Sequence, residues 1–163
     1  MSVTIRAYIE KDIDKMRLIW NEVVSDGIAF PQDHELTREM ASEFFSYQTY
    51  CGVAENEETK EILGLYILHP NNVGRCTHIC NCSYAVLSQA RGQGIGESLV
   101  RDSILQGKNK GFKILQFNAV VATNTVALKL YEKLGFVKLG VITKGFLMKD
   151  GHYEDIIPHY IEL

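Results

Sequence analysis

The stretch Arg91-Gly92-Gln93-Gly94-Ile95-Gly96 decides the fold of this chain, because it stands between two segments of different periodicity. The residues before it, Cys82 to Val86, have the composition of a β-strand, and the run from Glu97 to Gly111 has the spacing of an amphipathic helix. A glycine-rich turn between strand and helix gathers unpaired backbone N–H groups at the positive end of the helix, where a pyrophosphate binds readily. The sequence therefore predicts a site for a phosphorylated cofactor at residues 91–96.

The spacing of the glycines separates this loop from two common phosphate-binding motifs. A dinucleotide fold needs G-x-G-x-x-G followed by an acidic residue about 20 positions later, and a P-loop needs G-x-x-x-x-G-K-[ST]. The chain instead has Gly92, Gly94 and Gly96 in alternation, in the pattern R-x-x-G-x-G. Neither a dinucleotide nor a nucleoside triphosphate is therefore indicated as the ligand.

Length and composition predict one compact domain that spans residues 1–163. A chain of 163 residues buries roughly 70% of its extended surface, and 46% hydrophobic with 23% charged residues is typical of globular proteins. The net charge of −3 argues against a nucleic-acid partner. No run of about 18 apolar residues is present, and the first residues alternate as in a strand, unlike a signal peptide. We therefore expect a cytoplasmic protein without a membrane partner.

Four cysteines raise the question of a metal site, because three of them lie in the run Cys76-Thr77-His78-Ile79-Cys80-Asn81-Cys82. Positions 76, 78, 80 and 82 share one parity, so in a β-strand their side chains lie on one face, about 6.6 Å apart per step. At that spacing they cannot converge on one zinc ion. We expect reduced, half-buried thiols and no metal, with the alternative open if the segment is a loop.

Hydrophobic periodicity predicts an alternation of strands and helices along the whole chain. The expected strands are Val3 to Ile9, Cys51 to Glu55, Glu61 to His69, Thr77 to Leu87, Ile114 to Val121, Val137 to Thr143 and Tyr153 to Ile161. The expected helices are Lys11 to Ser25, Thr37 to Gln48, Glu97 to Gly111 and Thr125 to Leu134, the last two ended by Gly111 and Gly135 in the left-handed conformation. The connection between the first two helices, which includes Phe30, is either a surface loop or part of a substrate pocket.

Two motifs together carry a resemblance to a known family. The glycine loop resembles the acyl-CoA pyrophosphate loop of the GNAT (GCN5-related) N-acetyltransferases. The later run from Asn124 to Phe136 is similar to the GNAT segment N-x-x-A-x-x-L-Y-x-x-x-G-F, and it stands at the expected distance. The resemblance implies an α/β (α+β) fold with a single GNAT domain, in which about four helices flank a mixed sheet of about seven strands.

The same resemblance implies that acetyl-CoA is the cofactor. It implies cofactor-binding roles for these residues: Tyr84, Ala85, Val86, Arg91, Gly92, Gln93, Gly94, Ile95, Gly96, Asn124, Ala127 and Tyr131. The strand residues would act through their backbone, and Tyr131 would lie near the sulfur. Asn124, Ala127 and Tyr131 stand at i, i+3 and i+7, on one side of a helix over about 10.5 Å. An N-cap, a packing contact and a core aromatic are the alternative roles for the three.

The chemistry expected of such an enzyme is direct attack of an amine on the thioester carbonyl. An alkyl ammonium group with a pKa near 9 to 10 is only about 0.1 to 1% neutral at pH 7, so a base or a desolvating pocket is needed. No residue is singled out as that base by the sequence. A backbone N–H near Val86 is the expected donor to the carbonyl oxygen, and partial proton donation to the thiolate is the expected catalytic role of Tyr131.

A narrower resemblance concerns the acceptor. The unusual run R-C-[ST]-H-x-C-N at residues 75–81, with Phe117-Asn118 and Thr123-Asn124, is similar to the fungal acetyltransferases that detoxify proline analogues such as azetidine-2-carboxylate. That resemblance implies that Asn81 binds a substrate carboxylate and that Asn118 and Asn124 hold the reacting centre. Ordinary pairing with neighbouring backbone is the alternative role for Asn81 and Asn118.

Two departures limit that comparison. The chain lacks the long N-terminal extension of the fungal enzymes, and Tyr131 stands where a tryptophan is expected. Other residues, including Trp20-Asn21 and Gly145-Phe146, resemble phosphinothricin-type acetyltransferases, which also acetylate an amino acid. Both comparisons imply a small-molecule amine as substrate. A non-catalytic acyl-CoA sensor, an enzyme for protein or polyamine amines, and a pure interaction domain remain alternatives, and an open edge at Tyr153 to Leu163 would allow a homodimer.

Overall fold

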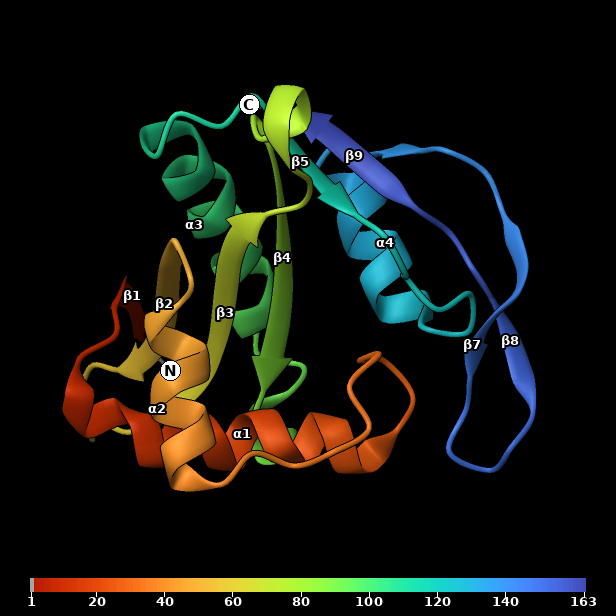
Figure 1. Cartoon of the computed structure of the whole chain (residues 1–163). Helices are drawn as coiled ribbons and strands as arrows, with labels where there is room; N and C mark the ends of the chain where they lie inside the picture. Colours follow the sequence, from red (N-terminus) through yellow and green to blue (C-terminus); the bar gives the residue numbers. More distant parts are fainter. Residues whose placement is uncertain (1) are drawn as a thin grey trace.

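The computed structural model describes residues 2–163 and consists of a mixed sheet with helices on both faces (Figure 1). The seven-stranded sheet has the order β1-β2-β3-β4-β5-β9-β6, and two further strands form a separate hairpin, β7-β8. The strands are β1 (Val3–Ala7), β2 (Tyr50–Asn56), β3 (Ile62–Pro70), β4 (Ile79–Val86), β5 (Ile114–Phe117), β6 (Val137–Lys138), β7 (Ile142–Leu147), β8 (Tyr153–Ile156) and β9 (His159–Glu162). The helices are α1 (Ile13–Asp26), α2 (Arg38–Ser46), α3 (Ile95–Asn109) and α4 (Thr125–Lys133). This architecture confirms the predicted fold class.

The sheet divides at its middle. Strands β1 to β4 form an antiparallel meander, whereas β4 and β5 run parallel and pair only at Ile79 with Ile114 and at Cys80 with Leu115. Beyond Cys80 the two strands diverge, as Figure 1 shows. The divergence leaves one edge of β4 without a neighbouring strand in the interior of the sheet.

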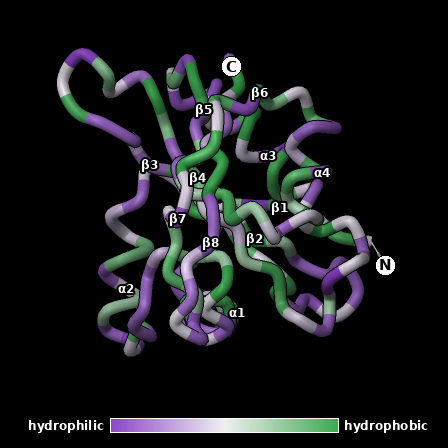
Figure 2. Tube along the Cα trace, turned by 90° about the vertical axis from the view of Figure 1, so that its right-hand side faces the viewer, coloured by the Kyte–Doolittle hydropathy of each residue, from purple (hydrophilic) through white to green (hydrophobic). Residues whose placement is uncertain are grey.

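Each face of the sheet carries its own hydrophobic core, because strand side chains alternate between faces. Leu65 and Ile67 of β3 pack with α1 and α2, which contribute Trp20 and Phe45. The intervening Tyr66 and Leu68 pack with α3 and α4, together with buried residues such as Leu99, Tyr131 and Phe136. In Figure 2 the trace of α2 alternates between hydrophilic and hydrophobic residues, as expected of a helix that covers one face of a sheet. We call these the α1–α2 face and the α3–α4 face.

Two helix ends confirm the predicted glycine signals. Gly111 has φ +89° directly after the C-cap of α3, and Gly135 has φ +87° directly after the C-cap of α4. After Gly135 the chain turns back, since Phe136 N–H donates to the Tyr131 carbonyl at 3.0 Å and its ring lies 5.4 Å from the Tyr131 ring. Phe136, which follows the turn at the end of α4, therefore packs into the α3–α4 core.

Two strands predicted in the middle of the chain are longer than the strands in the structure. The strand expected at Ile114 to Val121 ends at Phe117, because the chain leaves the sheet where β4 and β5 diverge. The strand expected at Thr77 to Leu87 begins only at Ile79, since residues 74–76 form a 3₁₀ turn. Cys76 is consequently exposed and lies outside the strand, so the single-face argument applies to Cys80 and Cys82 alone.

The C-terminal prediction of two long strands is wrong. The segment Val137 to Thr143 breaks at residues 139–141, where Gly140 has φ +139°, and becomes β6 and the start of β7. The segment Tyr153 to Ile161 breaks at Pro158, which lacks the N–H that a sheet ladder requires, and becomes β8 and β9. Strand β9 lies between β5 and β6, so the open edge expected at Tyr153 to Leu163 is also wrong.

Candidate active site

The site begins with the free edge of β4, and the strand register determines which backbone groups face it. The register between β3 and β4 is constant, because the residue numbers of every partner pair add up to 150. The hydrogen bonds from the Leu87 N–H to the Leu63 carbonyl (2.9 Å) and from the Asn71 N–H to the Ile79 carbonyl (2.8 Å) extend this ladder at its two ends. Odd-numbered residues of β4 therefore direct their backbone groups to β3, and even-numbered residues direct theirs to the divergence. Tyr84 and Val86 thus present N–H and C=O groups there.

This register divides the three β4 residues that were expected to bind a cofactor through their backbone. Tyr84 and Val86 have the required orientation, whereas Ala85 pairs with Leu65 of β3. The methyl group of Ala85 is buried in the core of the α1–α2 face. Ala85 therefore has neither a backbone group nor a side chain available at the divergence.

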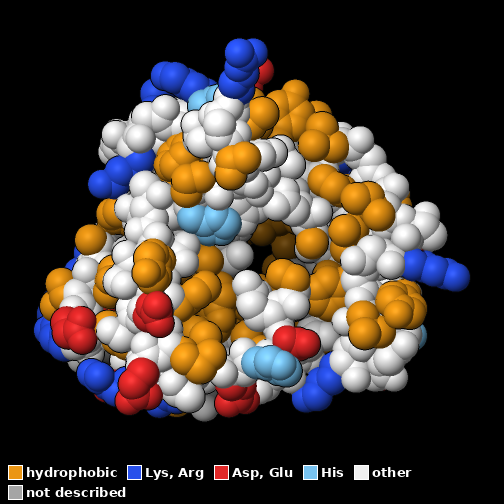
Figure 3. All heavy atoms as spheres, viewed as in Figure 1, with side chains coloured by type: hydrophobic (Ala, Val, Ile, Leu, Met, Phe, Trp, Pro, Cys, Tyr) orange, Lys and Arg blue, Asp and Glu red, His pale blue; other side chains and the backbone are white. Residues whose placement is uncertain are grey.

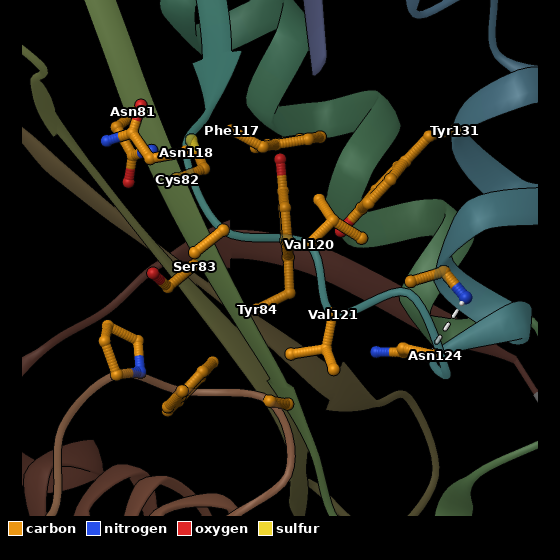
Figure 4. A pocket seen from close by; sticks show the side chains of 15 residues that line it. Asn81, Cys82, Ser83, Tyr84, Phe117, Asn118, Val120, Val121, Asn124 and Tyr131 are labelled. Atoms are coloured by element: carbon orange, nitrogen blue, oxygen red, sulfur yellow. Dashed lines mark hydrogen bonds between the residues drawn. The ribbon is translucent and has the colours of Figure 1, made fainter. Parts of the chain in front are cut away.

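A cavity of about 170 Å³ occupies the space between β4, β5 and α4, and we call it the central cavity. Figure 3 shows a hollow near the middle of the side of the molecule that it views, with hydrophobic side chains around it. Figure 4 shows the lining from close by. Side chains from both faces of the sheet reach the cavity, because the missing strand neighbour opens a passage through the sheet. The lining residues are Ala29, Phe30, Pro31, Asn81, Cys82, Ser83, Tyr84, Phe117, Asn118, Ala119, Val120, Val121, Asn124, Ala127 and Tyr131.

The central cavity brings together many of the predicted site residues. Asn124, Ala127 and Tyr131 line it from one side of α4, as their helical spacing predicted. The connection between α1 and α2 contributes Phe30, so this loop lines the cavity and is not merely a surface connection. The glycine loop at residues 91–96 lies outside the lining and forms a separate part of the site.

Tyr131 has the environment of a proton donor. Its ring packs between Phe117 (4.5 Å between ring centroids) and Phe136, and in Figure 4 it points from α4 into the cavity toward Val120. Burial raises the pKa of Tyr131 well above the ordinary tyrosine value. Within residues 2–163 its hydroxyl has no hydrogen-bond partner. The hydroxyl therefore remains protonated at neutral pH and is available to a ligand.

Asn124 has a structural role as well as a place at the cavity. Its side-chain oxygen accepts the N–H of Ala127 at 3.2 Å, which makes it the N-cap of α4 (Figure 4). Ala127 is partly buried against the α3–α4 core. The capping and packing roles considered from the sequence are thus confirmed for both residues, and they coexist with positions in the cavity lining.

The two candidate acceptor-binding asparagines are paired with neighbouring groups. Asn81 Nδ2 donates to the Gln116 carbonyl of β5 at 2.8 Å, across the point where β4 and β5 diverge. Asn118 and Asn71 exchange two amide hydrogen bonds, at 2.6 and 3.2 Å. Both side chains therefore have the pairing that was the alternative to ligand binding, although Asn81 keeps one N–H and its Oδ1 unpaired.

The titratable β4 side chains of the cavity are protonated at neutral pH. Burial raises the pKa of the Cys82 thiol well above its usual value, so Cys82 is not a thiolate nucleophile. Burial likewise raises the pKa of Tyr84, whose hydroxyl lies 2.7 Å from Ser103 Oγ on α3. Neither side chain can accept a proton from a ligand, which argues against a covalent acyl-enzyme at Cys82.

The glycine loop has the geometry of an anion site. Gly92 (φ +78°) and Gly94 (φ +81°) need glycine for their backbone conformation, and Gly94 caps α3. Ser98 N–H donates to the Gly94 carbonyl, and the structure records no acceptor for the three preceding N–H groups, at residues 95–97. Because Ile95 is buried, only its N–H can contribute. Three amides at a helix N-terminus are therefore free to bind an anion.

Gly96 gives the loop its most specific feature. Its φ is not positive, and a Cβ built there would meet nothing within 4 Å. Neither backbone conformation nor internal packing thus explains a glycine inside the first turn of α3, where glycine costs about 0.5–1 kcal/mol relative to alanine. Close approach of a ligand to the backbone does explain it.

Charged side chains around the loop leave its anion site close to neutral before a ligand binds. Arg91 forms an exposed ion pair with Asp26 at 3.2 Å and donates from Nε to the Val86 carbonyl at 3.3 Å. Glu97 in the first turn of α3 is paired with Arg101 (2.8 Å) and with Lys133 of α4 (2.6 Å). Local attraction for a phosphate therefore comes from the free amides together with Arg91.

A second cavity adjoins the first on the α1–α2 face, and we call it the side cavity. It is lined by Pro31, Gln32, Phe44, Tyr47, Gln48, Ile67, His69, Asn81 and Ser83. Pro31, Asn81 and Ser83 line both cavities, so the two adjoin at these residues. His69 and Gln48 did not emerge from the sequence, because their position depends on the register of β3 and on the packing of α2. No local motif marks either residue.

The described part of the chain shows neither a cluster of metal ligands nor a membrane-spanning helix. Among residues 2–163, no group of three or more His, Cys, Asp or Glu side chains is placed to hold a metal ion. In the same range, no helix combines the length and the apolar character that crossing a membrane requires.

Comparison with known proteins places this architecture in a class. The family model described as the acetyltransferase (GNAT) family matches residues 17–136. N-acetyltransferase aca1 of Schizosaccharomyces pombe is 33% identical, over 86% of this chain and 74% of that protein. A GCN5-related N-acetyltransferase from Kribbella flavida superposes with a TM-score of 0.90 at 32% identity, over 99% of this chain and 98% of that one.

A more distant structure shares the fold. The phosphinothricin acetyltransferase from Sinorhizobium meliloti, solved in complex with acetyl-CoA, has a TM-score of 0.92 at 21% identity, covering 100% of this chain and 89% of that one. The fold, the glycine loop and the family match together define an N-acetyltransferase. The chain belongs to the acetyltransferase (GNAT) family.

Proposed function

We propose that this acetyltransferase uses acetyl-CoA as its donor and transfers the acetyl group to the amino group of a small molecule, an amino acid or an amino acid analogue. One observation carries the proposal: the passage between β4 and β5 has the free amides of α3 on the donor side and a side cavity on the other. Such a passage lets donor and acceptor meet from opposite faces of the sheet.

The residues present fit acetyl-CoA. The free amides at residues 95–97, with Arg91, Gln93 and the open positions at Gly92, Gly94 and Gly96, would hold its diphosphate. The backbone of Tyr84 and Val86, and the α4 residues Asn124, Ala127 and Tyr131, would line its pantetheine arm. Bound there, acetyl-CoA supplies a thioester whose carbonyl is the electrophile.

The chain's own groups have two tasks at the reacting centre. The Val86 N–H, held rigid by the β3–β4 ladder, donates a hydrogen bond to the carbonyl oxygen. Tyr131 holds a proton on its hydroxyl and shares it with the departing sulfur. Because burial raises the pKa of Tyr131, we expect partial sharing of the proton and not its complete transfer.

The composition of the two cavities supports a small acceptor without a second positive charge. Of the described residues, those that line the cavities include no Asp, Glu, Lys or Arg. A polyamine would find no carboxylate for its further ammonium groups. A zwitterion would use the unpaired N–H of Asn81 for its carboxylate, with Asn118 and Phe30 beside it.

The test is a panel of acceptors with acetyl-CoA, read as release of free thiol. Free amino acids, proline analogues and phosphinothricin should support release, and spermidine and a lysine peptide serve as the competing classes. Turnover that prefers spermidine or the peptide would contradict the substrate proposal. Calorimetric binding of acetyl-CoA without thiol release from any amine would instead identify an acyl-CoA sensor.

We also propose that residues 1–163 act as one domain in the cytoplasm and form a homodimer. Free thiols at Cys51, Cys80 and Cys82 support a reducing compartment. Because the expected C-terminal edge is covered, we place the dimer contact at the β6–β7 segment, where Leu139 and Val141 are 55% and 61% exposed. A monomer mass in gel filtration with light scattering would contradict the dimer.

A further inference from the structure

The side cavity has a wall of two strand residues that face each other. His69 of β3 is the register partner of Asn81 of β4, and both line the side cavity. Asn81 also lines the central cavity, next to the residues of α4. His69 is therefore directly opposite Asn81, the residue at which the two cavities meet, and it lies on the acceptor side of the passage.

Two unpaired side-chain oxygens of this lining can accept hydrogen bonds. Gln48 donates its amide N–H to the Phe44 carbonyl at 2.8 Å, which leaves its Oε1 buried and without a partner in the described chain. Asn81 donates to Gln116, and its Oδ1 has no partner within residues 2–163. A ligand rich in N–H groups, such as a protonated amine, complements such a lining.

The ring of His69 is oriented so that it too accepts. Its Nδ1 lies 2.9 Å from the Pro70 carbonyl. A carbonyl oxygen has no proton, so the contact requires the proton of a neutral imidazole to be on Nδ1. The lone pair is then on Nε2, which is free to take up a proton.

Other candidate bases are missing from both cavities. Among the described residues, no carboxylate lines either one, and Cys82, Tyr84 and Tyr131 are held protonated by burial. The titratable groups near His69 are Tyr47, the C-cap of α2, and Cys51 of β2, which pairs with Ile67, and burial raises the pKa of Cys51 to about 12. The remaining described lining, from β4, residues 44 and 48, and residues 31–32, carries no titratable group, so no fixed charge of this lining stands beside the ring.

We propose that His69 is the general base of this enzyme, accepting a proton on Nε2 from the ammonium group of the acceptor. The N–H bond of the ammonium breaks, its electron pair stays on the amine nitrogen as the attacking pair, and a new N–H bond forms on the ring. Because His69 is partly exposed, the proton then leaves to water. The proposal rests on the acetyltransferase function proposed above and identifies the group that prepares its acceptor.

The decisive variant is His69→Asn, in which the amide nitrogen replaces Nδ1 and keeps the bond to the Pro70 carbonyl, while the Nε2 acceptor is lost. His78→Asn is the matched control, because His78 is exposed and lines neither cavity. We would measure kcat/KM from pH 5.5 to 10 with an amino acid acceptor. Acetyl-CoA affinity by calorimetry and the melting temperature would show whether the variants remain folded.

The wild-type protein and His78→Asn should show the same pH profile, which falls on the acid side as the base is protonated. His69→Asn should lose about 10²- to 10⁴-fold at pH 7. Its kcat/KM should rise tenfold per pH unit until the amine itself is neutral near pH 9 to 10, where the gap closes.

A second acceptor separates a lost base from a damaged site. A weakly basic amine, already neutral at pH 7, should react almost equally with wild type and His69→Asn. An unchanged pH profile in His69→Asn, or an equal loss with both acceptors, would overturn the role of His69. Absence of thiol release from the wild-type protein with every amine would overturn the proposed function instead, so the two failures are distinguishable.

Discussion

The two faces of the sheet contribute to the site by different means. On the α3–α4 face, the glycine loop and β4 offer backbone groups, namely the free amides of α3 and the edge of β4, and α4 adds side chains. On the α1–α2 face, the side cavity is built from side chains of α2, β3, β4 and the residues after α1. Binding through the backbone requires closely spaced glycines, which form a recognisable sequence motif. A cavity assembled from four distant segments has no such motif.

This contrast explains which half of the function was predictable. A thioester donor bound through main-chain amides constrains a few adjacent positions, as at Gly94 and Gly96. The acceptor site proposed at Gln48, His69 and Asn81 depends on how β3, β4 and the end of α2 pack together. We expect variants on the donor face to change cofactor affinity or turnover, and variants on the acceptor face to change acceptor kinetics.

Among variants on the donor side of the site, the largest effect should come from Tyr131→Phe. Loss of the hydroxyl removes the proton shared with the departing sulfur, so kcat should fall about 10- to 1000-fold while acetyl-CoA affinity changes little. Stopped-flow or steady-state thiol release gives kcat, and calorimetry gives the affinity. Tyr153→Phe, at an exposed position of β8, is the control and should retain full activity. Unchanged turnover in Tyr131→Phe would remove this residue from the chemistry.

Gly96→Ala should weaken the donor site alone. A methyl group meets nothing in the chain, so the melting temperature should stay constant or rise, since alanine is the better helix former. The Kd for acetyl-CoA should rise about tenfold, equivalent to about 1.4 kcal/mol, because the methyl group obstructs close approach to the amides. The acceptor KM should not change. A stable variant with wild-type affinity would show that the diphosphate does not approach this turn.

Asn81→Ala should test the acceptor side. Loss of one hydrogen bond to a ligand should raise KM about fivefold, equivalent to about 1 kcal/mol. The change should be confined to acceptors with a carboxylate, and the corresponding carboxamides provide the control. Loss of the bond to Gln116 should also lower stability by about 1 kcal/mol, measured by urea unfolding. An equal rise in KM for both acceptor series would place the contact at the amine.

The smallest kinetic effect is expected far from both cavities, at Asp12→Asn. Burial raises the pKa of Asp12, but hydrogen bonds from Arg6 and from the Ile9 N–H outweigh it, so the pKa is lowered overall. The carboxylate therefore stabilises the fold above the unfolded-state pKa near 3.9, and this contribution is lost as pH falls through the lower folded-state value.

For Asp12→Asn we expect a loss of about 2–3 kcal/mol at pH 7 that shrinks below about pH 4. Urea unfolding at several pH values measures it, and kcat for the folded variant should equal that of the wild type. Because Arg6 and Asp12 join β1 to the turn before α1, a change in acceptor KM without one in acetyl-CoA affinity would show that the α1–α2 face transmits strain to the side cavity.

Prediction from sequence succeeded where the signal is local. The ends of two helices near Gly111 and Gly135 follow from backbone conformation. The position of Asn124 and Tyr131 on one side of the cavity follows from the helical period. Prediction failed at the C-terminus, where apolar alternation across Pro158 read as one strand. The place of β9 between β5 and β6 depends on pairing with residues far away in the sequence, which periodicity does not record.

The amino-acid sequence by itself indicated a phosphorylated ligand, because an anion site made of main-chain amides requires closely spaced glycines, and the resemblance of two motifs to a known family indicated the class of enzyme. Only the tertiary structure decided the rest. The parallel pairing of β4 with β5 stops at Cys80, and this termination opens the passage through the sheet, frees the even-numbered backbone groups of β4 and places His69 beside Asn81. These arrangements depend on strand register and on packing between residues far apart in the chain, and neither is encoded in any single segment.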